Sequence, residues 1–321
     1  MTYSVAIRTL GTSGENLVRE LKSINAQTLQ PEKVMIYIAE GYQRPDFQIG
    51  NEEYVWVKKG MVAQRALPYT EILSDYILLL DDDVELLPDS VERLFDAAVK
   101  EQADVVGADT FKNQDMPLKG KIAAILTNWV YPHADDIWAF KVTRHEGFSY
   151  QNKPRKDYYL SQSCAGPASL WCKDILLKLH LEDELFLDNL GFAFGDDLLE
   201  FHKVYLNGYK LFVHYNCGIV HLDAKSSSAA YHKNENKFYV RAKGSFILWW
   251  RACYEIRSAK LLTAVVFTLK LLWLFLVNCV AALAFRNPKI PYLYIKGLSD
   301  AYAFVHSEDY TSVPKLNAYK R

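Results

Sequence analysis

A triplet of aspartates is the first group in this sequence whose residue types and spacing could do chemistry. Asp81, Asp82 and Asp83 follow five apolar residues, 76–80, that read as a buried strand. In an extended chain Asp81 and Asp83 point the same way and Asp82 the other way. Ligands bind at the carboxyl ends of strands in open α/β sheets, and carboxylates suit Mg²⁺ or Mn²⁺. The triplet therefore predicts a metal site for a diphosphate; the alternative is a solvated acidic turn before the next helix.

A second acidic pair, Asp196 and Asp197, follows Gly195 and precedes a helical run to Tyr205. Acidic residues at a helix start commonly complement the helix dipole, and that is the structural alternative. The functional interpretation makes one carboxylate a general base, which takes a proton from a hydroxyl as it attacks. Of the two, we favour Asp197.

The elements that must position these carboxylates alternate between strands and helices. Apolar runs predict strands over 5–10, 34–39, 54–57, 76–80 and 104–108, and further regular patterning covers 168–179, 196–206, 211–214 and 219–221. Helical spacing follows the first strand and the triplet. This alternation predicts an α/β domain with a mostly parallel central sheet flanked by helices. Residues 111–162 show weak periodicity and suit a variable lobe on the acceptor side.

Composition excludes several classes of protein. The 321 residues carry 37 basic and 38 acidic side chains, so no global field attracts nucleic acid. Five cysteines at irregular spacing fit neither a zinc site nor a disulfide framework, and we interpret them as reduced. The start of the chain enters a strand pattern at once, which favours a cytoplasmic location for the bulk of the chain.

Residues 261–285 form a long apolar segment whose only charge is Lys270. As a helix the segment is about 37 Å long, enough to cross a bilayer. However, Thr263, Lys270 and Asn278 share one side of that helix. This polar seam favours packing on protein or lying in the membrane interface. Basic residues flank both ends, so they do not define an orientation.

Five segments together resemble family 2 glycosyltransferases of the GT-A fold, and especially rhamnosyl- and galactosyltransferase-like members. They are residues 23–28 (SINAQT), 76–88 (YILLLDDDVELLP), 195–198 (GDDL), 208–210 (GYK) and 238–243 (FYVRAK). Each motif alone is weak, but their order and spacing are specific. The chain lacks the Q-x-x-R-W motif of processive synthases, so the resemblance favours single sugar addition.

The resemblance implies a role for each group of acidic residues. Asp83 and Asp81 would hold Mg²⁺ or Mn²⁺, with His221 completing the metal shell; the alternative for His221 is a partly buried histidine bonded to backbone. Asp197 would be the catalytic base beside Asp196. The family commonly has Glu in place of Asp196 and an Arg where this chain has His202-Lys203, which leaves the local ion-pair partner open.

The resemblance also implies contacts to the nucleotide. Glu40, after the second strand, would accept a hydrogen bond from a uracil or thymine base; an ordinary loop acid is the alternative. Thr9 and Arg65 match further nucleotide-contact positions, and Asp81 and Asp82 border the diphosphate.

These observations predict an inverting, metal-dependent transferase that moves a sugar from a UDP- or dTDP-sugar donor to a glycan or lipid-linked acceptor. It would work at the cytoplasmic face of a membrane; the sequence leaves open whether it forms a homo-oligomer. The alternatives are a nucleotidyltransferase, which usually needs a Gly-rich loop with a lysine that residues 10–14 lack, and an inactive glycan-binding protein on a membrane.

The expected organisation divides the chain into four parts. These are a catalytic domain (1–225, including the 111–162 lobe), a helical connection (226–260), a membrane helix that spans or lies in plane (261–285) and a tail (286–321).

Overall fold

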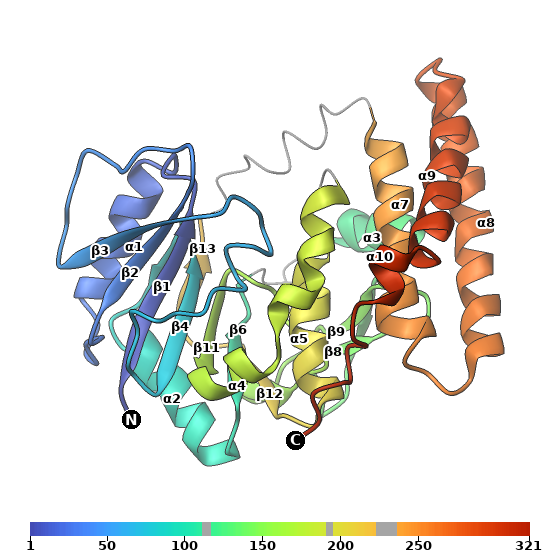
Figure 1. The fold of residues 1–321 in the computed structure, drawn as a ribbon. Helices are drawn as coiled ribbons and strands as arrows, with labels where there is room; N and C mark the ends of the chain where they lie inside the picture. Colours follow the sequence, from blue (N-terminus) through green and yellow to red (C-terminus); the bar gives the residue numbers. More distant parts are fainter. Residues whose placement is uncertain (111–116, 191–194, 223–235) are drawn as a thin grey trace.

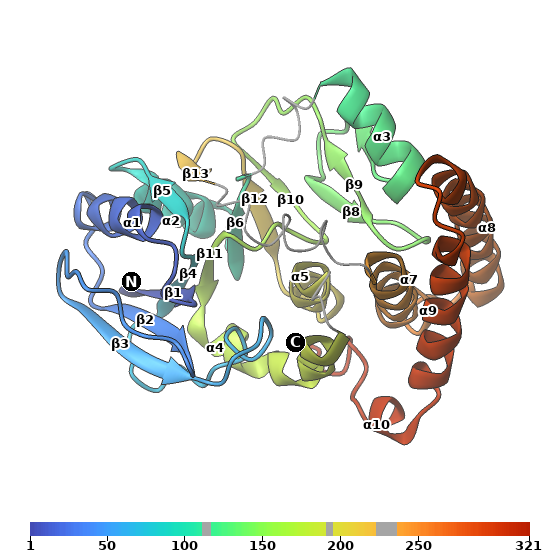
Figure 2. The same ribbon diagram turned by 90° about the horizontal axis from the view of Figure 1, so that it is seen from above.

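The computed structural model describes residues 1–110, 117–190, 195–222 and 236–321 (Figures 1 and 2). Its centre is an eight-stranded sheet. In spatial order the strands are β10 (Tyr158–Leu160), β12 (Leu211–His214), β6 (Val105–Ala108), β11 (Ala168–Cys172), β4 (Tyr76–Asp81), β1 (Tyr3–Thr9), β2 (Val34–Ala39) and β3 (Glu52–Val57). β1 to β4 pair in parallel, as do β6 and β12, whereas β11 is antiparallel between β4 and β6 and β10 is antiparallel at the edge. The predicted mostly parallel α/β sheet is confirmed.

Helices cover both faces of this sheet, which is why its central strands are apolar on both sides. α1 (Glu15–Asn25) and α2 (Ser90–Glu101) pack on one face, and α4 (Lys173–Lys178) and α5 (Asp196–Leu206) pack on the other. Leu78 and Leu80 of β4 belong to the first core, and Ile77 and Leu79 belong to the second. All five cysteines are free, as predicted.

Two small sheets accompany the central one. β5 (Val84–Leu86) directly follows the aspartate triplet and pairs antiparallel with β13 (Ile219–His221). In the variable lobe, α3 (Leu118–Asn128) precedes a three-stranded sheet of β7 (Tyr131–His133), β9 (Phe148–Gln151) and β8 (Phe140–Val142). Strands of three or four residues are too short to give a readable period, so the sequence showed the lobe but not its sheet.

The C-terminal quarter, from residue 237 onward, is helical and stands beside α5, away from β1–β3 (Figure 2). It consists of α7 (Lys237–Trp249), the π-helical turn η3 (Trp250–Tyr254), α8 (Lys260–Ala284), α9 (Lys289–Val305) and α10 (Glu308–Thr311). A third core joins α5 and the short helix η2 (Leu181–Leu190) to α7, α8 and α9. Within the described residues, α8 is the single helix that is long and apolar enough to cross a membrane.

The last residues of the chain return to the catalytic domain after the helices. The Asn207 side chain, just after α5, donates to the Leu316 carbonyl at 2.6 Å and accepts from the Tyr319 amide at 2.7 Å. The Tyr319 hydroxyl donates to Asp183 in η2 at 2.7 Å, and the Arg321 amide donates to the Asn207 carbonyl at 2.9 Å. The C-terminus is therefore fixed to the end of α5.

Candidate active site

The carboxyl ends of β1, β2 and β4 meet at one edge of the sheet because these strands run in parallel. This places Thr9, Glu40 and Asp81 along the same edge, as the sequence predicted. The Thr9 hydroxyl donates to Asp82, and its oxygen accepts from the Gly11 amide at 2.6 Å. Glu40 is exposed directly after β2.

The three aspartates do not share one environment. Asp81 is the last residue of β4 and pairs with Arg8, its neighbour in β1, at 2.6 Å. Asp82 and Asp83 lie in the turn between β4 and β5, so the alternation of side chains ends at Asp81. The expectation that Asp81 and Asp83 act side by side is therefore not met: a buried arginine on the next strand holds Asp81.

Asp83 instead meets His221. The pairing of β5 with β13 sets His221 opposite Val84, and its Nε2 lies 3.0 Å from Asp83 Oδ1. The Leu222 amide donates to the Asp83 carbonyl at 2.7 Å, which fixes the two segments together. A carboxylate and an imidazole are both ligands of divalent metals. Over the described ranges, no group of three or more His, Cys, Asp or Glu side chains is assembled for a metal.

Burial and mutual repulsion affect the acids around the triplet. Burial raises the pKa of Asp82, and Asp81 and Asp83 add to this, although hydrogen bonds from Ser13 and Thr9 oppose it. Glu20 of α1 is fully buried behind the triplet, and burial followed by the charges of Asp82, Asp81 and Asp83 raises its pKa well above the usual range. Folding therefore favours the protonated form of Glu20, in which this side chain adds no negative charge at this edge.

The second acidic pair begins α5 in two different environments. Asp196 is buried, whereas 31% of the Asp197 side chain is exposed. Asp197 Oδ1 pairs with Arg65, and its Oδ2 accepts from the Gly166 amide at 3.0 Å. Of the two aspartates, Asp197 is the one that is both held in position and partly exposed to solvent.

Arg65 is the ion-pair partner that the sequence left open. Its guanidinium lies 3.3 Å from Asp196, 2.9 Å from Glu200 and 4.0 Å from Asp81, in addition to its contact with Asp197. The segment after β3 that carries it is a helical turn whose first amides, Val62 and Ala63, are capped by Asp188 at 2.9 and 3.0 Å. Arg65 is buried, so it faces the carboxylates rather than open solvent.

The charges in this cluster change each other's pKa. Burial opposes the charge on Arg65, but Asp196, Asp197 and Glu200 outweigh it and hold its pKa well above the usual value. Burial raises the pKa of Asp196 to about 7, with repulsion from Asp197 and Glu200, although Arg65 opposes the shift. Burial likewise raises the pKa of Glu200 against the pull of Arg65. The cluster therefore depends on Arg65 for its balance of charge.

Gly166 gives a test of this packing. A Cβ added to it would overlap Asp197 Oδ1 and lie 2.8 Å from Arg65 Nη2. We expect Gly166→Ala to displace both groups and to reduce turnover about 100-fold, since small misplacements of catalytic groups have effects of that size. The measurement is the transfer rate beside the melting temperature. The matched control is Gly244→Ala in α7, where a Cβ meets nothing within 4 Å; equal activity of the two variants would contradict the prediction.

The family model for "Glycosyl transferase family 2" matches residues 56–176, which include β4, the triplet and β11. This part of the chain therefore resembles a family 2 glycosyltransferase. A search of curated proteins finds no match to the sequence. The family resemblance inferred from the sequence motifs is thus confirmed.

Two solved structures are similar to this chain, and the first of them supports its fold. A mannosyltransferase, PcManGT from Pyrobaculum calidifontis, solved with GDP-Man and Mn²⁺, is 12% identical with a TM-score of 0.51, over 99% of this chain and 84% of that one. GalNAc-T7, solved with UDP, GalNAc and Mn²⁺, is 13% identical with a TM-score of 0.47, over 68% of this chain. This chain spans 43% of the length of GalNAc-T7. The GT-A fold expected from the sequence is confirmed.

Several residues of the site were not identified from the sequence. They are Arg8, Glu20, Gly166, Asp188 and Glu200. Two had a readable signal: Arg8 is the one charged residue in the apolar strand β1, and Glu200 lies three residues after Asp197, on the same helix face. The other three owe their positions to contacts between distant segments.

Proposed function

We propose that the chain is an inverting glycosyltransferase that moves a sugar from a UDP- or dTDP-sugar to a hydroxyl of a glycan or lipid-linked acceptor, assisted by Mg²⁺ or Mn²⁺. One observation carries the proposal. Arg65 lies between Asp81, at the end of β4, and Asp197, at the start of α5, so the two acidic motifs border one site. A donor diphosphate at the first motif would place its sugar toward the base at the second.

The residues present fit a divalent cation. Asp83 and His221 supply an oxygen and a nitrogen that are in contact with one another. Asp81 remains paired with Arg8 and borders the site. The carboxylates of the two motifs outnumber the arginines, so an anionic diphosphate needs a positive partner there. When bound, the cation would neutralise charge on the diphosphate leaving group.

The role of base falls to Asp197. Its carboxylate takes the proton from the acceptor hydroxyl as that oxygen bonds to the anomeric carbon, and the bond from that carbon to the diphosphate oxygen breaks. A single displacement inverts the configuration, and no covalent sugar–enzyme intermediate forms. Asp196, buried and partly protonated near neutral pH, supports Arg65 rather than the acceptor.

The nucleotide would lie along the edge formed by β1 and β2. Glu40 is exposed there and can accept a hydrogen bond from the N3 hydrogen of uracil or thymine. Thr9 holds Asp82 toward the diphosphate end. Arg65, assigned from the sequence to the nucleotide, is instead proposed to position Asp197.

The C-terminal helices would attach the enzyme to a membrane at its cytoplasmic face, which brings the site to a lipid-linked or membrane-bound acceptor. Support comes from α8, whose 25 residues include an 18-residue window with a mean hydropathy of 2.1, and only 17% of that window is buried. Such a surface is costly to leave in water.

The test is calorimetric titration of the full chain with UDP, dTDP and GDP, each with and without Mn²⁺; GDP is included because PcManGT was solved with GDP-Man. We expect UDP or dTDP to bind in the presence of Mn²⁺, and Asp83→Asn and His221→Gln each to weaken this binding. Asp96→Asn, with 72% of its side chain exposed on α2, is the control. Binding of no nucleotide, or binding indifferent to metal and to Asp83, would refute the proposal.

A further inference from the structure

On the polar side of the helix α8, Thr263 and Lys270 contact the catalytic domain. Lys270, in the middle of α8, pairs with Glu146 Oε2 at 2.6 Å and donates to the carbonyls of His145 at 2.9 Å and Glu146 at 3.3 Å. Thr263 accepts from Arg144 at 3.2 Å. All these partners lie in the turn between β8 and β9, so the three donors of Lys270 are satisfied by protein. The predicted polar seam therefore packs on the protein.

The opposite side of α8 is apolar and exposed along its whole length. Its large side chains recur at spacings of three and four residues and are 48% to 81% exposed: Leu262, Val265, Leu269, Leu272, Leu276, Val280 and Leu283. At 100° per residue these side chains lie within a sector of about 80°. A single continuous face of α8 thus lacks a covering element in the described structure.

The helix α3 extends this face. Leu118, Ile122, Ile125 and Leu126 of α3 are 41% to 73% exposed and recur on one side of the helix. α3 lies beside α8 (Figure 2), and Trp273, at the edge of the exposed face of α8, donates to the Leu126 carbonyl at 2.7 Å. We call the exposed sides of α3 and α8 the apolar platform.

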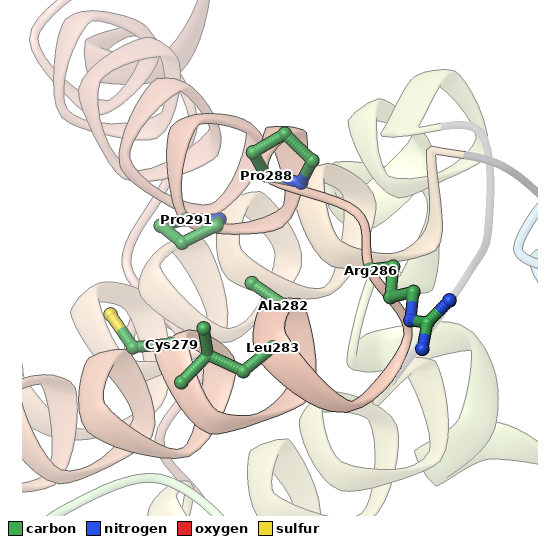
Figure 3. A pocket seen from close by; sticks show the side chains of 6 residues that line it. All are labelled: Cys279, Ala282, Leu283, Arg286, Pro288 and Pro291. Atoms are coloured by element: carbon green, nitrogen blue, oxygen red, sulfur yellow. The ribbon is translucent and has the colours of Figure 1, made fainter.

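The charges around the platform have one sign. No acidic residue occurs from 256 to 299. Apart from Lys270, which faces the protein, this stretch holds Arg257, Lys260, Arg286, Lys289 and Lys296, and Lys119 and Lys121 lie on α3. At the α8–α9 turn a depression lined by Cys279, Ala282, Leu283 and two prolines has Arg286 at its border (Figure 3). An apolar surface bordered by cations is complementary to lipid tails below anionic headgroups.

We propose that the platform lies in one leaflet of an anionic bilayer, with α8 parallel to the membrane plane, so that the enzyme attaches without spanning the membrane. This inference rests on the membrane attachment in the proposed function and specifies its geometry. If α8 crossed the bilayer, Lys270 and the β8–β9 turn would lie near its midplane. Irregular backbone is not tolerated next to lipid at that depth. Lying in plane, α8 keeps that turn on the protein side.

The first test is sedimentation of the full chain with vesicles. We expect binding to vesicles of phosphatidylcholine with phosphatidylglycerol to exceed binding to phosphatidylcholine alone, and Ile122→Glu and Leu269→Glu each to weaken it at least 10-fold. Val99→Glu is the control, since Val99 is 54% exposed on a helix outside the platform. Unchanged vesicle binding of Ile122→Glu would show that α3 is not part of the membrane-binding surface. Light scattering that shows a dimer broken by both substitutions, with vesicle binding unchanged, would identify the platform as a self-association face and overturn the proposal.

The second test separates the in-plane from the spanning arrangement. Ser258→Cys and Arg286→Cys place thiols at the two exposed ends of α8, in the full chain bound to sealed vesicles. A membrane-impermeant maleimide added outside, read by peptide mass, should modify both. Protection of one end would show that α8 spans the bilayer. Nucleotide titration of the same samples tests the transferase proposal separately, because neither thiol lies near the site. Nucleotide binding with one protected end would contradict only the in-plane arrangement.

Discussion

Replacing Asp197 with Asn is expected to reduce sugar transfer about 10²- to 10⁴-fold, the usual contribution of a general base. Asn keeps the size of the side chain and can still accept from the Gly166 amide, but it cannot take the acceptor proton. Arg65 keeps Asp196 and Glu200 as partners, so the fold should survive. The measurements are the turnover number and the affinity for the nucleotide with Mn²⁺.

The control is Asp174→Asn on α4, where an exposed carboxylate is lost away from the site. Because the base acts on the acceptor rather than on the diphosphate, nucleotide affinity should be largely unchanged in Asp197→Asn. A large fall in nucleotide affinity with little change in turnover would assign Asp197 to donor binding.

Replacing Arg65 with Gln is expected to lower the free energy of unfolding by about 3–5 kcal/mol at pH 7, because buried carboxylates lose their cation. Asp196 and Glu200 are both buried, and removal of Arg65 raises their pKa values further. An acid whose pKa is raised by folding stabilises the protein below its unfolded pKa, and this contribution is lost as the pH rises through the folded pKa. The difference in free energy of unfolding between Arg65→Gln and the unsubstituted protein should therefore shrink as the pH falls from 7 toward 5.

Denaturant unfolding at pH 7 and pH 5 measures both parts of this prediction. The control is Arg19→Gln, which removes an ion pair with Glu85 in which the two side chains are 50% and 40% exposed; such surface pairs contribute about 0–1 kcal/mol. If Arg65→Gln loses little free energy of unfolding, or loses more as the pH falls, the carboxylates must have a positive partner other than Arg65.

Much of the fold could be predicted because its signals are local. The strand Val34–Ala39 and the helix Asp196–Leu206 agree with the predicted ranges, and the apolar segment 261–285 became α8, Lys260–Ala284. Each signal is a continuous run or a helical period. The position of the triplet at the edge of the sheet followed from a strand that ends in polar residues.

The partners within the site could not be predicted in the same way. The alternation that grouped Asp81 with Asp83 holds only while the chain stays extended, and the chain turns after Asp81. Arg65 and Asp197 are 132 residues apart, and no local sequence pattern near either residue indicates that they are partners. Their contact arises from the packing of the turn after β3 against α5, which is a tertiary property.

The return of the chain terminus to Asn207 has a mechanical consequence. α8 and α9 leave the catalytic domain through α7 and come back to it through Tyr319 and Arg321, so this helical arm is clamped at both of its ends. An arm attached at one end can pivot relative to the catalytic domain. An arm attached at both ends keeps a fixed height and tilt relative to that domain. On a bilayer, the clamp would set the distance between Asp197 and the lipid surface, so that acceptor hydroxyls at one distance from the membrane are favoured over nearer or farther ones.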